Sequence, residues 1–265
     1  MNAASAMVQG AELRTRRASP AVTPFLGCYW WVDVEHGTRL RTFPDACTGV
    51  SIVIQPGAAP ECYFIGPRLI PREGTPSVGH SLFGVRLKPG AAFLFTRNPV
   101  RDLVGERMRL AEIAPDEALG FEQRLQSAST VDQHFDALEE LMLSRLAGRS
   151  IHPCVQKAIE IVEQSGGQIR IAELARSCDI STRGLARLLG TWLGLSPKTL
   201  ARVTRFQRFL QHMETEPNES SAARAIDLGY FDQAHLTKEV AQFFGATPGR
   251  MSPHHVADFS KTRCE

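Results

Sequence analysis

Two arginines spaced one helical turn apart, Arg183 and Arg187, are the side chains best placed for chemistry in this chain. Guanidinium groups donate paired hydrogen bonds to guanine edges and also bind phosphate oxygens. Both arginines share a helix face with the small residues Thr182 and Ala186, because the apolar residues fall on the opposite face. Those apolar residues are Leu185, Leu188, Leu189 and Trp192. A short, uncrowded and cationic face is what a helix needs to enter a DNA major groove.

The helix that carries these arginines has clear predicted ends. Ser181 can cap its first turn with a side-chain oxygen, and Gly194 can adopt the left-handed backbone that ends many helices. The preceding residues 171–180 are expected to form a shorter helix. Together the two segments predict a helix-turn-helix in which residues 182–193 are the recognition helix.

The same pattern of caps, inward leucine, basic residue and glycine recurs 51 positions later in the chain. The matched pairs are Ser181 with Asp232, Leu185 with Leu236, Arg187 with Lys238, Gly194 with Gly245, Ser196 with Thr247, and Pro197 with Pro248. This repeat predicts a second helix-turn-helix. Its outer face would carry Gln233, Ala234, Thr237 and Lys238.

Residues 196–215 are expected to form one helix that joins the two units, since apolar residues recur there at helical spacing. About 20 residues at 1.5 Å each give a rod of roughly 30 Å. Successive major grooves on one side of B-DNA are ~34 Å apart. The joining helix would therefore hold the two recognition helices about one DNA turn apart, and we expect its Arg202 to contact DNA as well.

Charge is distributed unequally between the two units. Residues 168–213 contain eight basic residues and two acidic ones, a net charge of +6, whereas residues 214–265 contain five basic and eight acidic residues, a net charge of −3. Neutralisation of phosphates supplies most non-specific affinity for DNA. We expect the first unit and the joining helix to anchor the protein on DNA, and the second unit to add sequence discrimination.

The segment GYFDQAHLTKEVAQFFGATPGRM, residues 229–251, resembles the signature of the AraC/XylS family of bacterial transcription regulators. The segment LARLLGTWLGLSPKTLARVTRFQRFL, residues 185–210, resembles the first helix-turn-helix and joining helix of that family. The resemblance covers residues 152–252. It implies double-stranded DNA as a partner, with RNA polymerase, a small-molecule effector and a second copy of the chain as further partners. The chain departs from the family at Leu189 and Val240, where phenylalanine is usual.

Length and composition fit a two-domain protein. The 265 residues are 43% hydrophobic and 22% charged, as in ordinary soluble proteins, and no run approaches the ~20 apolar residues that span a membrane. Residues 1–19 include Arg14, Arg16 and Arg17 but no apolar signal core, so they are expected to form a flexible leader of a cytoplasmic protein. We therefore expect no contact with a membrane.

Residues 20–150 are expected to form a β-rich, barrel-like domain followed by helices. Short apolar runs from residue 22 to 95 are separated by Pro- and Gly-containing turns, which is typical of antiparallel strands. The interior of such a domain commonly holds a small ligand. The segments PDACTGVSIVI, FIGP and GVRLKPGAA resemble the N-terminal domain of one little-characterised subgroup of the same family. Trp30 and Trp31 could line a pocket, although paired strand aromatics more often place one ring in the core.

No catalytic or metal-binding constellation is visible in the N-terminal domain. His36 and His80 are isolated, with no second ligand at metal-binding spacing. The six cysteines contain no C-x-x-C pair, which argues against a zinc ribbon or a thioredoxin-like motif. A sensory role for Cys28, Cys47 or Cys62 stays open. We expect neither an enzyme nor a bound cofactor, and the ligand-binding residues are not identified.

Phe135, Leu138, Met142 and Leu146 recur at helical spacing within residues 131–146. This stripe could pack on the sheet of its own domain, or form the dimer seam that the resemblance implies. A hinge is expected at residues 148–150, followed by a helix that begins at Pro153.

The working hypothesis is an α+β protein with a leader (1–19), a β-rich sensory domain (20–150), and an all-α DNA-binding domain with two helix-turn-helix units (151–255). The alternative is a small-molecule-binding or enzymatic β-domain joined to a helical module that binds a protein partner. The repeat with a groove-length spacer favours the first, because a protein-binding module has no reason to keep that spacing.

Overall fold

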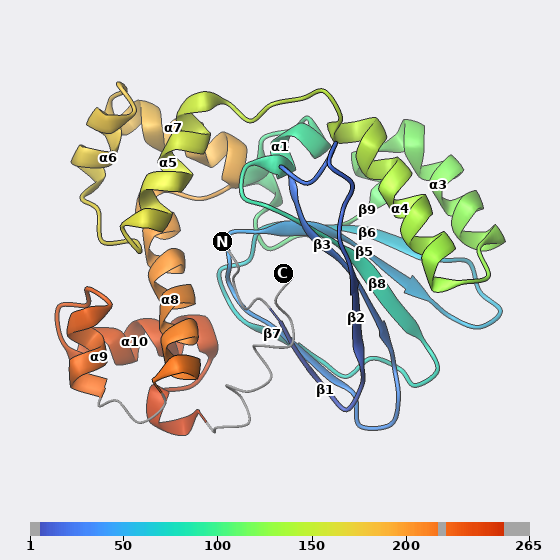
Figure 1. Ribbon diagram of the computed structural model, residues 1–265, viewed down its shortest axis with the longest axis horizontal. Coiled ribbons are helices and arrows are strands. Elements are labelled where there is room, and N and C mark those ends of the chain that lie inside the picture. The colour runs from blue at the N-terminus through green and yellow to red at the C-terminus, as the bar shows by residue number, and fades with distance from the viewer. Residues whose placement is uncertain (1–5, 217–220, 252–265) are drawn as a thin grey trace.

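The structure is a computed structural model that describes residues 6–216 and 221–251. Two antiparallel sheets form the first part of the chain (Figure 1). The strands are β1 Ala6–Gln9, β2 Leu13–Arg16, β3 Leu26–Asp33, β4 Arg39–Thr42, β5 Thr48–Ile54, β6 Glu61–Ile65, β7 Arg72–Gly74, β8 Ser81–Leu87 and β9 Arg107–Arg109. The larger sheet has the order β2-β3-β8-β5-β6-β9, and the smaller has the order β1-β4-β7.

The β-rich domain predicted from the sequence is confirmed, but its sheets do not close into a barrel within the described residues. The larger sheet ends at β2 on one side and at β9 on the other. The three short strands β1, β4 and β7 pair with one another instead of extending the larger sheet. The result is two open sheets.

The flexible leader predicted for residues 1–19 is wrong over residues 6–16. β1 pairs with β4, and β2 pairs with β3. Two ion pairs add to the pairing of β2, since Arg14 lies 2.7 Å from Asp33 of the neighbouring β3 and Arg16 lies 2.6 Å from Asp136. The arginines that suggested a solvated leader are the side chains that attach this strand.

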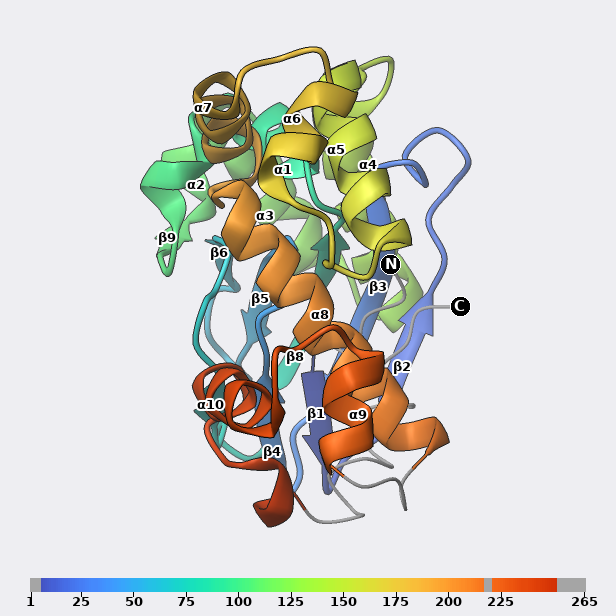
Figure 2. The same cartoon turned by 90° about the vertical axis from the view of Figure 1, so that its left-hand side faces the viewer.

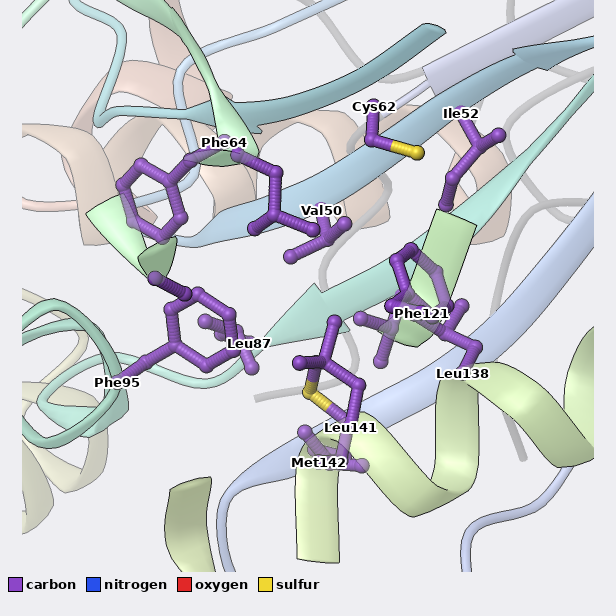
Figure 3. Packing of buried hydrophobic residues seen from close by; sticks show 14 of the residues in the cluster. Val50, Ile52, Cys62, Phe64, Leu87, Phe95, Phe121, Leu138, Leu141 and Met142 are labelled. Carbon is purple, nitrogen blue, oxygen red and sulfur yellow. The ribbon is translucent and has the colours of Figure 1, made fainter. Parts of the chain in front are cut away.

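Helices cover one face of the larger sheet, at the top centre and upper right of Figure 1. They are α1 Ala91–Thr96, η1 Val100–Leu103, α2 Leu110–Ile113, α3 Pro115–Ser127 and α4 Val131–Leu146. Figure 3 shows Val50 and Ile52 of β5 packed with Phe121 of α3 and Leu138 of α4. Because side chains alternate along a strand, Ser51 and Val53 face the other side of the sheet, where they line a cavity.

The apolar stripe of α4 packs on the sheet of the same chain. Phe135, Leu138, Met142 and Leu146 are all buried there, and Phe135 lies against Tyr29 and Trp31 of β3. Of the two alternatives for this stripe, the intramolecular core is therefore the observed one. A dimer seam would need a different surface.

The C-terminal part is helical: α5 Pro153–Gln164, α6 Ile171–Ser177, α7 Thr182–Leu193, α8 Pro197–Thr215, α9 Ser221–Asp227, α10 Gln233–Phe244 and η2 Pro248–Arg250. α6 with α7, and α9 with α10, form the two predicted helix-turn-helix units, joined by α8. None of the helices in the described part of the chain is long and apolar enough to span a bilayer.

The caps predicted from the sequence position both recognition helices. The Ser181 side chain accepts a hydrogen bond from the Gly184 amide at 3.1 Å, and Asp232 accepts one from the His235 amide at 2.7 Å. Gly194 and Gly245 end the helices with left-handed φ values of 72° and 84°. The same local chemistry thus builds both units.

Candidate nucleic-acid interface and cavity

The outer face of α7 is arranged as the sequence predicts. Thr182, Arg183, Ala186 and Arg187 are exposed, whereas Leu185 and Leu189 are fully buried. The remaining apolar residues of the stripe, Leu188 and Trp192, are half-buried against the core. Two cationic side chains one turn apart therefore project from a helix whose inner face is fixed by packing.

α10 presents the corresponding face of the second unit. Gln233, Ala234 and Lys238 are exposed and Thr237 is half-buried, while the inner face holds the buried residues Leu236, Val240, Phe243 and Phe244. A shallow open hollow runs along this face, lined by Asp232, Gln233, Ala234, Thr237, Lys238 and Ala241. The outer face of α10 carries one exposed cation, Lys238, whereas that of α7 carries two, Arg183 and Arg187.

The two recognition helices lie along one edge of the molecule. Figure 2 shows α7 and α10 nearly end-on, one above the other, with α8 running between them. Two helices seen end-on in one view have roughly parallel axes. This is the arrangement that two successive major grooves on one side of a duplex require.

Arg202 is held in a cluster that sequence reasoning missed. Its Nε lies 2.7 Å from Oε2 of Glu239, and its Nη2 donates to Oε1 of Gln242 at 2.6 Å. Arg205 lies 3.7 Å from the other oxygen of Glu239 and donates to the Gly229 carbonyl at 2.9 Å. Arg202 therefore fastens α8 to α10, while 27% of its side chain stays exposed.

Glu239 itself lies on the buried face of α10, with only 3% of its side chain exposed. The sequence contained a signal for this, because Glu239 shares helical spacing with Leu236, Val240 and Phe243. Burial raises the pKa of the neighbouring Tyr230 hydroxyl, and the nearby Glu239 carboxylate raises it further. Glu239, an acid on the apolar face of its helix, is therefore the buried partner of Arg202 and Arg205.

The structure changes the charge comparison between the units. Arg202 and Arg205 share Glu239, so they are partly neutralised. The exposed cations of the first unit and α8 are Arg170, Arg176, Arg183, Arg187, Lys198 and Arg208. In the described part of the second unit the exposed cations are Lys238 and Arg250. The predicted excess of positive charge on the first unit persists on the exposed surface.

A cavity of about 560 Å³ is lined by residues of both sheets. Its apolar wall includes Val8, Leu40 and Val53, together with Trp30. Trp31 lies on the opposite face of β3, where it stacks on Phe83 with ring centroids 4.9 Å apart. The tryptophan pair thus divides between the cavity and the core. A volume of this size is typical of small-molecule sites.

The histidines and cysteines of this domain do not gather into a reactive site in the described residues, where no cluster of potential metal ligands occurs. His80 lines the cavity, and His36 is exposed. Cys47 and Cys62 are free thiols, and burial raises the pKa of each to about 12. Both thiols stay protonated at neutral pH, which disfavours reactivity.

Strand β4 lies between the cavity and α10. Leu40 and Thr42 line the cavity. Arg41, which points the other way, donates to the Phe244 carbonyl and lies over the Phe244 ring at 4.4 Å. Nearby, Nε2 of Gln207 on α8 donates to the Pro44 carbonyl at 2.6 Å. The strand that closes the cavity is therefore attached to the second helix-turn-helix.

The first unit also contacts the β-rich part of the chain. Trp192 near the end of α7 packs against Phe93 of α1, with ring centroids 4.6 Å apart and ring planes tilted by 43°. The backbone carbonyl of Val100 would lie only 2.9 Å from a Cβ at Gly194, so this close approach requires glycine as well as its left-handed φ. Both units are thus in contact with elements of the N-terminal half.

Two segments of the chain match known protein families. Residues 14–109 match a family described as a domain of unknown function (DUF6597), and residues 174–252 match a family described as a helix-turn-helix domain. No curated protein matches the chain in sequence.

Structures of ToxT from Vibrio cholerae resemble the chain along most of its length. One, in crystal form P21, is 9% identical over 96% of this chain and 98% of that chain, with a TM-score of 0.42. A second, bound to (E)-4-(8-methylnaphthalen-1-yl)but-3-enoic acid, is 10% identical over 96% and 99%, also with a TM-score of 0.42. A third, bound to an unsaturated fatty acid, is 12% identical over 92% of each chain, with a TM-score of 0.41.

Proposed function

We propose that this chain is a DNA-binding transcription regulator of the AraC/XylS type, and that it inserts α7 and α10 of its matched helix-turn-helix domain into two successive major grooves. Thr182, Arg183, Ala186 and Arg187 face the first groove, and Gln233, Ala234, Thr237 and Lys238 face the second. A small ligand in the cavity between the sheets controls this binding.

One observation carries the DNA-reading part of the proposal. The eight residues assigned to the grooves lie on two roughly parallel helices, and seven of them are exposed, with Thr237 half-buried. The opposite faces of both helices are buried in one core. An exposed, small and polar face on a helix held rigid from behind suits direct readout of base edges.

Control by a ligand is supported by the position of β4. This strand contributes Leu40 and Thr42 to the cavity and Arg41 to α10. A ligand that moves β4 changes the environment of the second recognition helix. Such control requires that the ligand bind the two arrangements with different affinity.

Selection from a library of random DNA duplexes tests the two-groove assignment. The full chain should enrich two half-sites whose centres are about 10–10.5 base pairs apart. The double variant Arg183→Ala/Arg187→Ala should lose sequence preference at one half-site, and Gln233→Ala/Thr237→Ala at the other. If both double variants affected the same half-site, or if one half-site alone were enriched, two-groove reading would be wrong.

A further inference from the structure

Three arginines at one side of the cavity, Arg68, Arg72 and Arg107, have no carboxylate partner among the described residues, although the other lining cation is paired. Arg86 lies 2.7 Å from Asp45. Even arginines close to the cavity are paired, since Arg41 lies 2.9 Å from Glu73 and Arg109 lies 3.8 Å from Glu61. The three lining arginines form no ion pair within residues 6–216 and 221–251. We call this set the arginine cluster.

Arg68 is the half-buried member of the arginine cluster. Its Nη1 donates to Oγ1 of Thr42 at 3.2 Å, which directs the guanidinium toward β4. Burial, together with the nearby charges of Arg72 and Arg107, lowers the pKa of Arg68 to about 10, although the Asp45 carboxylate acts in the opposite direction. A partly desolvated cation beside two like charges is unfavourable unless an anion joins it.

The other two members are held at the rim. Arg107 on β9 stacks over the Tyr63 ring at 3.5 Å, which restricts its guanidinium. Arg72 begins β7 and pairs in register with Thr42 of β4. Both are exposed, so the cluster runs from solvent into the cavity. An anion can reach Arg68 from outside by this route.

The remainder of the cavity is mostly apolar, with valine, leucine and isoleucine side chains and the Trp30 ring. Its lining carboxylates are already occupied, since Asp45 pairs with Arg86 and Glu61 accepts a hydrogen bond from the Tyr63 hydroxyl at 2.7 Å. An apolar cavity with three arginines near one another suits a ligand that has an anionic group attached to an apolar body.

We propose that the cavity binds an amphipathic anion, whose carboxylate or phosphate group is held by Arg68 with Arg72 and Arg107 and whose apolar body lies between the two sheets. This inference rests on the proposed function, because it names the class of ligand that would control DNA binding. Guanidinium groups bind both kinds of anion, often through two parallel hydrogen bonds.

Calorimetry on the full chain tests the ligand class with three probes of one tail length: octanoate, octyl phosphate and 1-octanol. At least one anion should bind tenfold or more tightly than the alcohol, because a charge-assisted hydrogen bond contributes about that much. Whichever anion binds more tightly identifies the head group. Arg68→Gln should weaken anion binding about tenfold or more while leaving binding of the alcohol unchanged.

Two further variants keep the test decisive. Arg72→Gln alters an exposed side chain and should weaken anion binding even if Arg68→Gln fails to fold. Arg124→Gln is the matched control, because Arg124 lies on α3 and pairs with Glu140 at 2.9 Å, away from the cavity. Equal affinity for anion and alcohol, no binding of any probe, or unchanged anion affinity in Arg72→Gln would overturn the proposal.

DNA affinity measured in the same samples separates this inference from the proposed function. If an anion binds through the arginine cluster and DNA affinity does not change, the ligand class stands and ligand control fails. If the chain reads two half-sites but no anion binds, the DNA-reading proposal stands and the ligand class is wrong.

Discussion

Phe43 and Phe244 stack face to face, with ring centroids 5.0 Å apart and ring planes only 4° from parallel. Phe43 follows strand β4, and Phe244 is the last residue of α10. Phe43 is also part of the C-terminal core cluster, although it belongs to the N-terminal, β-rich part of the chain. The β-rich part thus contributes a ring to the interior of the second helix-turn-helix.

Replacing Arg41 should uncouple the cavity from α10. Arg41 contacts Phe244 but does not line the cavity, so Arg41→Gln should leave ligand affinity unchanged. The coupling free energy between ligand binding and DNA binding, typically about 1–3 kcal/mol, should be smaller in this variant than in the parent chain. Fluorescence anisotropy with and without ligand measures it. Arg39→Gln, at the exposed start of β4, is the control, and equal coupling in both variants would refute this route.

Arg183→Ala and Arg187→Ala should each weaken binding to the selected DNA site by about 1–3 kcal/mol if the lost contact is to a base. Both side chains are exposed and are not needed for packing, so the melting temperature should stay near that of the parent chain. Titration of labelled duplex measures the affinity. Parent-like affinity in both variants would show that α7 does not read this groove.

The salt dependence of DNA binding should reflect the unequal exposed charge. Arg187→Ala with Lys198→Ala should reduce the slope of log K against log salt by about 1.8, since each lost phosphate contact contributes about 0.9. Lys238→Ala should reduce it by clearly less. A reduction by Lys238→Ala equal to that of the double variant would mean that the second unit anchors the protein as strongly as the first.

Glu239→Gln should destabilise the C-terminal domain. The substitution removes the carboxylate shared by Arg202 and Arg205, which keep 27% and 15% of their side chains exposed. We expect a loss of about 3 kcal/mol, at the lower end for a buried pair because Arg202 is partly hydrated. Urea unfolding measures it. Glu173→Gln, an exposed acid on α6, is the control; similar stability of both variants would contradict a structural ion pair at Glu239.

Cys47 and Cys62 should resist alkylation by iodoacetamide at pH 8 in the folded chain and react in denaturant. Burial raises each pKa from 9.0 to about 12, so the folded chain holds more protons than the unfolded chain between these values. The contribution of these two thiols to the free energy of unfolding should therefore be complete below pH 9 and be lost as the pH rises toward 12. Mass spectrometry locates the labels, and fast labelling of either native thiol would argue for a sensory cysteine.

Helical period, capping residues and the internal repeat were sufficient to predict both helix-turn-helix units. Each of these signals is local: Ser181 bonds to the amide three residues later, and Gly194 ends the helix that Ser181 begins. The outer residues of α7 and α10 follow from the same period, because the buried leucines define the opposite face. The β-rich character of residues 22–95 was predictable for the same reason.

Partners that lie far apart in the chain were decided by the tertiary structure alone. The arginines among residues 1–19 suggested a solvated segment. In the structure, however, β1 pairs with β4 and β2 pairs with β3. The arginine cluster forms only because the fold brings Arg68, Arg72 of β7 and Arg107 of β9 to the same cavity. The pairing of Arg202 with Glu239 was decided in the same way. The energy of an ion pair depends on the distance and burial of both charges, which no local pattern records.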